Sequence, residues 1–154
     1  MLEFHCKTFH KLSVEELYEM LALRQEVFVI EQNCPYLDAD GKDQKSWHLW
    51  ACDDARKLVA YCRLMPQGMV YENYPAIGRV VTSPSCRGTG IGRQLVQAAL
   101  EWTAKLFGGQ PVKLSAQSYL IRFYESFGFQ TVGEEYLEDG IPHTAMILRP
   151  RQEV

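Results

Sequence analysis

The sequence predicts an α/β protein with a mixed, mostly antiparallel sheet and helices on both faces. Three observations lead to this prediction. Short β-prone runs alternate along the chain with longer segments whose apolar residues recur at helical spacing. Turn and capping residues separate these segments. The length of 154 residues suits one ordinary domain, so we expect residues 1–154 to form a single domain.

The first half of the chain predicts one helix followed by a hairpin. Ser13 and Glu16 match a capping box, and apolar residues follow them at helical spacing. Two β-prone runs then flank a polar turn, which is typical of paired antiparallel strands. The expected elements are a helix at 14–28, a loop at 30–46 with room for a short helix, and strands at 47–52 and 58–66.

The second half predicts four more strands and two more helices. From Ile91 onward, apolar residues fall on one helical face until Gly108 and Gly109 end the helix. Gly128 likewise ends a shorter helix at 119–127. The expected strands lie at 76–82, 112–116, 130–136 and 144–148, with a turn at 138–142 between the last two. The predicted order is therefore αβββαβαββ.

The composition narrows the classes of function. A net charge of −3 at pH 7 argues against a nucleic-acid partner and favours a cationic small one. Five scattered cysteines without a CxxC pair predict reduced thiols and no metal site. Met1–His10 lacks a signal-peptide pattern, and no run of about 18 apolar residues occurs. We therefore expect a cytoplasmic protein without a membrane partner.

A glycine-rich loop joins an expected strand to an expected helix. Its sequence is Arg87-Gly88-Thr89-Gly90-Ile91-Gly92. Glycines let the backbone turn tightly and approach a ligand, and the free N–H groups of a first helical turn carry partial positive charge. That arrangement binds phosphates. A glycine-rich turn without a ligand is the alternative.

Two familiar phosphate loops do not fit this spacing. A dinucleotide fold needs G-x-G-x-x-G and an acidic residue about 20 positions later. Here the third glycine comes one position early, and residues 110–115 contain no carboxylate. A P-loop ends in G-K-[ST], whereas this loop ends in Gly92-Arg93-Gln94.

The loop instead resembles the R-x-x-G-x-G signature of the GCN5-related N-acetyltransferase (GNAT) superfamily, in which it wraps the pyrophosphate of acetyl coenzyme A (acetyl-CoA). Residues 117–129 resemble a later motif of that family, although Gln117 stands in the place of an asparagine. The resemblance implies the GNAT fold and acetyl-CoA as the donor. It assigns cofactor binding to Val80, Val81, Thr82, Arg87, Gly88, Thr89, Gly90, Ile91, Gly92, Arg93, Gln117 and Tyr124.

Three further stretches are similar to the ElaA-type branch of this superfamily. They are residues 24–36, 77–81 and 138–143, and the similarity spans nearly the whole chain. The resemblance implies acetyl transfer to a primary amine on a small molecule or peptide. It leaves the identity of that amine open, along with the use of acyl groups longer than acetyl.

Transfer from a thioester to an amine needs a base for the amine and an acid for the leaving thiolate. Tyr124 is the expected acid because the family tyrosine occupies this motif position, and simple packing of its ring is the alternative. The base is open. Candidates are Glu31, His48, Glu138, His143 and a water molecule. Of these, His143 is favoured by its titration range and by Pro142 beside it.

An acidic segment follows the first expected helix. Asp38, Asp40 and Asp43 lack the further ligands of a calcium loop, so the alternatives are a solvated loop and an amine-attracting wall. We expect a cationic acceptor to be drawn toward residues 31–43, with Glu138, Asp139 and His143 forming the opposite wall.

Two rival functions remain. Arg24-x-x-Val27-Phe28 followed by spaced aspartates also resembles acyl-homoserine-lactone synthases, which generally lack the R-x-x-G-x-G loop. A non-catalytic acyl-CoA sensor is the other rival, and the presence of Tyr124 argues against it. The oligomeric state is open, with a homodimer through the C-terminal strands as one expectation.

Overall fold

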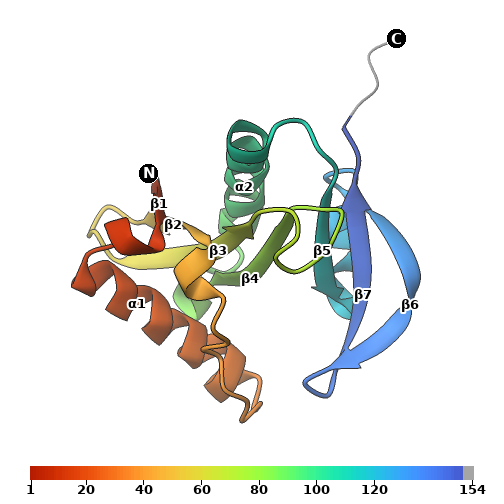
Figure 1. The fold of residues 1–154 in the computed structure, drawn as a ribbon. Coiled ribbons are helices and arrows are strands. Elements are labelled where there is room, and N and C mark those ends of the chain that lie inside the picture. The colour runs from red at the N-terminus through yellow and green to blue at the C-terminus, as the bar shows by residue number, and fades with distance from the viewer. Residues whose placement is uncertain (151–154) are drawn as a thin grey trace.

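A seven-stranded mixed sheet forms the centre of the computed structural model, which describes residues 1–150 (Figure 1). The strands lie in the order β1-β2-β3-β4-β5-β7-β6, and only β4 and β5 pair in parallel. Their bounds are β1 Glu3–Thr8, β2 Trp47–Cys52, β3 Leu58–Met65, β4 Ala76–Thr82, β5 Val112–Gln117, β6 Gln130–Glu138 and β7 Ile141–Leu148. The predicted mixed, mostly antiparallel sheet is confirmed.

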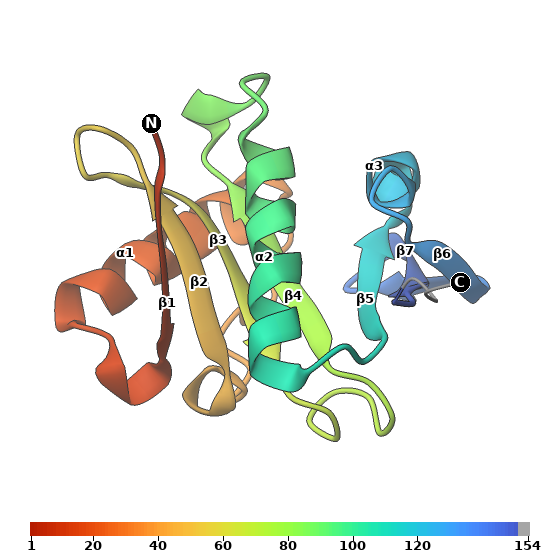
Figure 2. The ribbon, with the colours of Figure 1, turned by 90° about the horizontal axis from the view of Figure 1, so that it is seen from above.

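Helices cover both faces of this sheet, as predicted. The helices are α1 (Val14–Arg24), α2 (Ile91–Phe107) and α3 (Ile121–Glu125). Alternate side chains of β2 point to opposite faces, so Leu49 packs in the core under α2 while Trp50 packs in the core under α1. Figures 1 and 2 show these two helices on opposite sides of β1–β4.

The sheet divides between β4 and β5. These strands share a single paired position, Ala76 with Lys113, and the ladder ends there. Beyond it β5, β7 and β6 turn away from β1–β4 (Figure 2). A third core cluster joins the β1–β4 half to the β5–β7 half of the sheet. In it Val96 of α2 packs with Leu114 of β5 and Tyr124 of α3. This division positions the candidate site.

The N-terminal strand β1 was not predicted. It pairs antiparallel with β2 at the edge of the sheet, and the order is therefore βαβββαβαββ. Phe4 and Cys6 pack toward the core under α2, whereas the alternate residues Glu3, His5 and Lys7 are polar. The period of two is present in the sequence, but charged and histidine side chains make this run weakly β-prone.

The α-helical part of the first helix is shorter than the predicted range of residues 14–28. It ends at Arg24, and Gln25–Glu31 continue as a π-helix. The backbone N–H of Gln32 donates to the carbonyl of Val27, and that of Cys34 donates to that of Val29, each five residues back. The wider turn rotates the last residues of the predicted helix toward the divided sheet.

The last two strands are longer than predicted. The expected turn at 138–142 reduces to Asp139 and Gly140, with φ values of 53° and 76°. Two consecutive residues in the left-handed region match the tight hairpin turn whose twist suits paired strands. As a result His143, expected between the turn and the last strand, lies in β7 opposite Tyr136 of β6.

The smaller helix is also shorter than expected. A 3₁₀ turn at Ser118–Leu120 precedes α3, which ends at Glu125. Within residues 1–150 no helix is long and apolar enough to cross a membrane.

Candidate active site

A cavity opens where β4 and β5 separate. It has a volume of about 620 Å³. Its walls come from β4 and β5, the π-helix and the loop after it, the start of α2, α3, and the β6–β7 hairpin. The expected site residues that line it are Glu31, Val80, Val81, Thr82, Arg87, Gly88, Gly90, Ile91, Gly92, Arg93, Gln117, Tyr124, Glu138, Asp139 and His143. The expected residue Thr89 does not line it.

One end of the cavity is formed by the glycine loop and the start of α2. Gly88 and Gly90 have φ values of 81° and 82°, a region that L side chains rarely adopt, and Gly90 is the N-cap of α2. A Cβ at either position would meet no protein atom within 4 Å and would project into open space. The first N–H groups of α2 and two arginines, Arg87 and Arg93, therefore create a positive end that fits an anion.

A bulge in β4 interrupts the ladder with β3 inside the cavity. Tyr61 pairs with Val81 and Arg63 pairs with Gly78, so two residues of β4 stand opposite one residue of β3. One of them, Arg79, has a φ of 50°, which is unusual for a residue other than glycine. The bulge leaves part of the β4 backbone free of pairing in the middle of the site.

Tyr124 lies at the base of the cavity, where α3 meets β5. Its side chain is 5% exposed, and its ring packs edge-on against Phe123 and Phe129. Burial raises the pKa of its hydroxyl well above the ordinary value. The phenol therefore keeps its proton at neutral pH and has an O–H group that can donate.

His143 faces the cavity from β7 beside Gln117 of β5, its cross-strand neighbour. Its Nδ1 lies 2.7 Å from the carbonyl of Ile141 and must donate there, because a carbonyl only accepts. In the neutral ring Nε2 then carries the lone pair. Glu138 lies 3.3 Å from Nε2, and the ring of Tyr136 stacks on the imidazole.

Glu31 reaches across the cavity from the π-helix. Its Oε1 lies 2.7 Å from Nη1 of Arg87 in the glycine loop. The next residue, Gln32, accepts a hydrogen bond of 3.4 Å from the amide of Gln117, and Cys34 donates to the carbonyl of Asp139. The segment after the π-helix thus touches both the anion-binding end and the end near His143.

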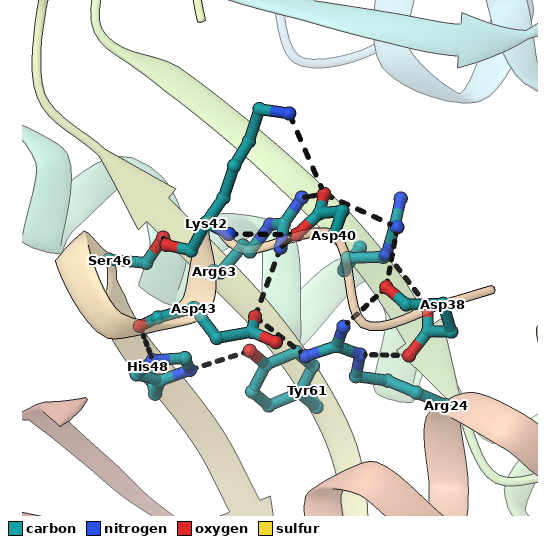
Figure 3. Close-up of polar contacts among 10 residues, drawn as sticks. Arg24, Asp38, Asp40, Lys42, Asp43, Ser46, His48, Tyr61 and Arg63 are labelled. Atoms are coloured by element: carbon teal, nitrogen blue, oxygen red, sulfur yellow. Dashed lines mark hydrogen bonds and ion pairs between the residues drawn. The ribbon is translucent and has the colours of Figure 1, made fainter. Parts of the chain in front are cut away.

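Three arginines neutralise the acidic segment after the π-helix. Figure 3 labels two of them, Arg24 and Arg63, beside the three aspartates. Arg24, fully buried at the end of α1, pairs with Asp38 at 2.7 Å and with Asp43 at 2.8 Å. Arg63 of β3 pairs with Asp40 and, at 3.0 Å, with Asp43. Arg79 lies 2.8 Å from Asp38, as an ion pair rather than an aligned hydrogen bond.

These contacts correct both readings of the segment. Asp38, Asp40 and Asp43 form neither a solvated loop nor a free amine-attracting wall, because each of them faces arginines. The guanidinium groups hold the pKa values of Asp40 and Asp43 below their ordinary range, against the effect of burial. Asp38 alone of the three lines the cavity.

His48 is not a candidate base in this structure. It is fully buried and lies outside the lining of the cavity. Its Nε2 donates to the carbonyl of Asp43 at 2.8 Å, and its Nδ1 accepts from the hydroxyl of Tyr61 at 2.7 Å. Burial lowers its pKa, so the ring is neutral and structural.

The arginine partners of the aspartates are not evident from the spacing of the aspartates alone. A signal existed. Arg63 lies within the otherwise apolar strand Leu58–Met65, every residue of which is buried. A charge in such a run needs an opposite charge, and the cluster of three aspartates at 38–43 is one source of it in the sequence.

Comparison with known proteins points to one family. Residues 23–150 match the family described as "Acetyltransferase (GNAT) domain". A UPF0039 protein of Synechocystis sp. is 47% identical over 141 residues, which cover 92% of this chain and 91% of that protein. Protein ElaA of Escherichia coli is 44% identical over 150 residues, with 95% of each chain covered.

Solved structures agree with this match. A crystal structure described as an acyl-CoA N-acyltransferase from Pseudomonas aeruginosa superposes with a TM-score of 0.89 at 44% identity. The superposition covers 96% of this chain and 99% of that chain. The resemblance to the ElaA-type branch is thereby confirmed.

We expect Asp43→Asn to destabilise the fold by about 3 kcal/mol at pH 7, because it leaves buried Arg24 and Arg63 short of a counter-charge. Since the pKa of Asp43 is lower when folded than its ordinary 3.8, its contribution is present above that value and fades as the pH falls below about 4. In urea unfolding, the difference in the free energy of unfolding between Asp43→Asn and the parent should therefore be smaller at pH 3 than at pH 7.

The control is Asp54→Asn, whose side chain is 85% exposed and pairs with the N-terminus. It should leave the unfolding midpoint nearly unchanged. Equal midpoints for Asp43→Asn and the parent at pH 7 would show that the ion pairs carry no stability.

Proposed function

Because this chain belongs to the GNAT acetyltransferase family, we propose that it transfers an acetyl group from acetyl-CoA to a primary amine on a small molecule or peptide. The observation that carries the proposal is the cavity between the diverging strands β4 and β5, which has the glycine loop and the start of α2 at one end. The five cysteines of the chain are free thiols, which suits the reducing cytoplasm as the place of reaction.

The donor's pyrophosphate suits the positive end of the cavity. Open space beside Gly88 and Gly90 lets phosphate oxygens approach the backbone, and the first turn of α2 supplies N–H donors. Arg87 and Arg93 add charge-assisted contacts, since both line the cavity. The family resemblance and the local geometry support the same placement.

The extended arm of the donor suits the gap between the strands. β4 loses its β5 partner after Ala76, so Val80, Val81 and Thr82 present strand backbone along the cavity. An extended ligand with amide groups can pair with such an edge, in the manner of an added strand. Gln117 on the opposite wall offers a side-chain amide.

The reaction joins the amine nitrogen to the carbonyl carbon and breaks the carbon–sulfur bond. The amine first loses a proton, for which the Nε2 lone pair of His143 is the best-placed acceptor, and Glu138 can stabilise the imidazolium that forms. The phenol of Tyr124 then donates a proton to the leaving thiolate. Free backbone at the Arg79 bulge supplies N–H groups for the developing oxyanion.

The test is an acceptor screen with acetyl-CoA as donor and released free thiol as readout. Small metabolite amines, polyamines, peptide N-termini and protein lysines are assayed separately. Acetylation of one class, shown by a mass gain of one acetyl group, supports the proposal. A chain that binds CoA but turns over none of the four classes would instead support the sensor function.

We expect Gly90→Asp to abolish CoA binding, because the new carboxylate would enter the phosphate-binding space and meet like charge. The residue would also be strained at a φ of 82°. Gly109→Asp adds the same charge after the far end of α2, where a Cβ also meets open space, and is the control. Calorimetric titration should show no heat of binding for the first variant and parental affinity for the second.

Circular dichroism confirms that both variants are folded before the titration. Parental CoA affinity in folded Gly90→Asp would remove the glycine loop from the binding site.

We expect Tyr124→Phe to lower turnover by about 100-fold, the usual scale for loss of a positioned general acid. Fold and CoA affinity should be retained, because the ring and its contacts with Phe123 and Phe129 remain. The comparison needs kcat under conditions where chemistry limits the rate, together with the CoA Kd and the unfolding midpoint. An unchanged kcat would show that the Tyr124 ring only packs in the core and that its hydroxyl does not act as the acid.

A further inference from the structure

Glu31 pairs with a cationic side chain of the same chain, Arg87, much as it could pair with an acceptor ammonium group. Its carboxylate pairs with the guanidinium of Arg87 at 2.7 Å, and both side chains line the cavity. No other cation of residues 1–150 pairs with Glu31. The pair therefore joins the acceptor side of the cavity to the phosphate-binding loop.

This ion pair is weak enough to exchange. The Arg87 and Glu31 side chains are 44% and 40% exposed, and exposed pairs contribute little to stability because water and salt screen them. A pyrophosphate on the glycine loop offers Arg87 more charge than one carboxylate does, with bidentate geometry. Binding of the donor should therefore draw Arg87 away from Glu31.

The released carboxylate would stay on the acceptor side. Gln32 accepts from Gln117, and Gln117 is the cross-strand neighbour of His143. Cys34 contacts Asp139 of the hairpin turn, so the whole segment after the π-helix borders the His143 end. Nearby Asp38 cannot play this part, because Arg24 and Arg79 already pair with it.

We propose that Glu31 is a binding site for the ammonium group of the acceptor, which Arg87 occupies until the pyrophosphate of the donor displaces it. Each ligand then favours the other, because an ammonium on Glu31 frees Arg87 for phosphate and phosphate on Arg87 frees Glu31 for ammonium. The inference rests on the proposed function and adds the reason why the donor prepares the acceptor site.

Calorimetric titration with CoA tests the exchange directly. Glu31→Gln should bind CoA about two- to fivefold more tightly than the parent, the scale of losing one exposed ion pair. The charge-matched control is Glu26→Gln, an exposed residue of the same π-helix that lies outside this cavity, and it should bind like the parent. In an Arg87→Gln background, which itself binds CoA more weakly, Glu31→Gln should add nothing.

Butylammonium is the probe for the second half of the proposal. At millimolar concentration it should tighten CoA binding by the parent but not by Glu31→Gln, and neutral butanol should affect neither. A parental CoA affinity for Glu31→Gln, or a parent that is indifferent to butylammonium, overturns the inference alone. A parent that binds no CoA overturns the proposed function and this inference with it.

Discussion

The site depends on a sheet that stops pairing at its centre. β4 and β5 share one paired position, and every wall of the cavity is built around the opening that follows. Opening a sheet exposes backbone groups that need partners, which water or a ligand can supply only at a surface-accessible cleft. The halves stay together because α2 spans them and packs with both, through Leu95 on one side and Val96 on the other.

Local signals explain which elements were predictable. β2 and β4 have the bounds that the sequence predicts, because each is a compact β-prone run between turn residues. The π-helix was not predictable from the apolar pattern, which continues past Arg24 at spacing close to that of an α-helix. β1 shows alternation but only partial burial at the sheet edge, so its hydrophobic signal is weak.

The candidate site likewise contains residues that the sequence predicts and residues that it does not. The glycine loop and Tyr124 were found because each belongs to a contiguous motif whose spacing carries the chemistry. The aspartates were misread because their partners lie far along the chain: Arg63 is 23 positions from Asp40, and Arg79 is 41 positions from Asp38. The sequence favours His143 over His48 only through the neighbouring Pro142, whereas strand pairing buries His48 and places His143 at the cavity.

Because of the π-helix, the number of residues in Gln25–Glu31 matters to the site. A π turn holds one residue more than an α turn, so a relative lacking one residue within Gln25–Glu31 could wind on as an ordinary α-helix. The lost residue and the tighter α turn would offset each other, so the residues after the deletion would keep nearly their present direction around the helix axis. The residue in the place of Glu31 would then stay at the cavity wall, although it stood one position nearer to α1 in the sequence. An alignment that closes a gap in this segment would therefore equate residues that occupy different places.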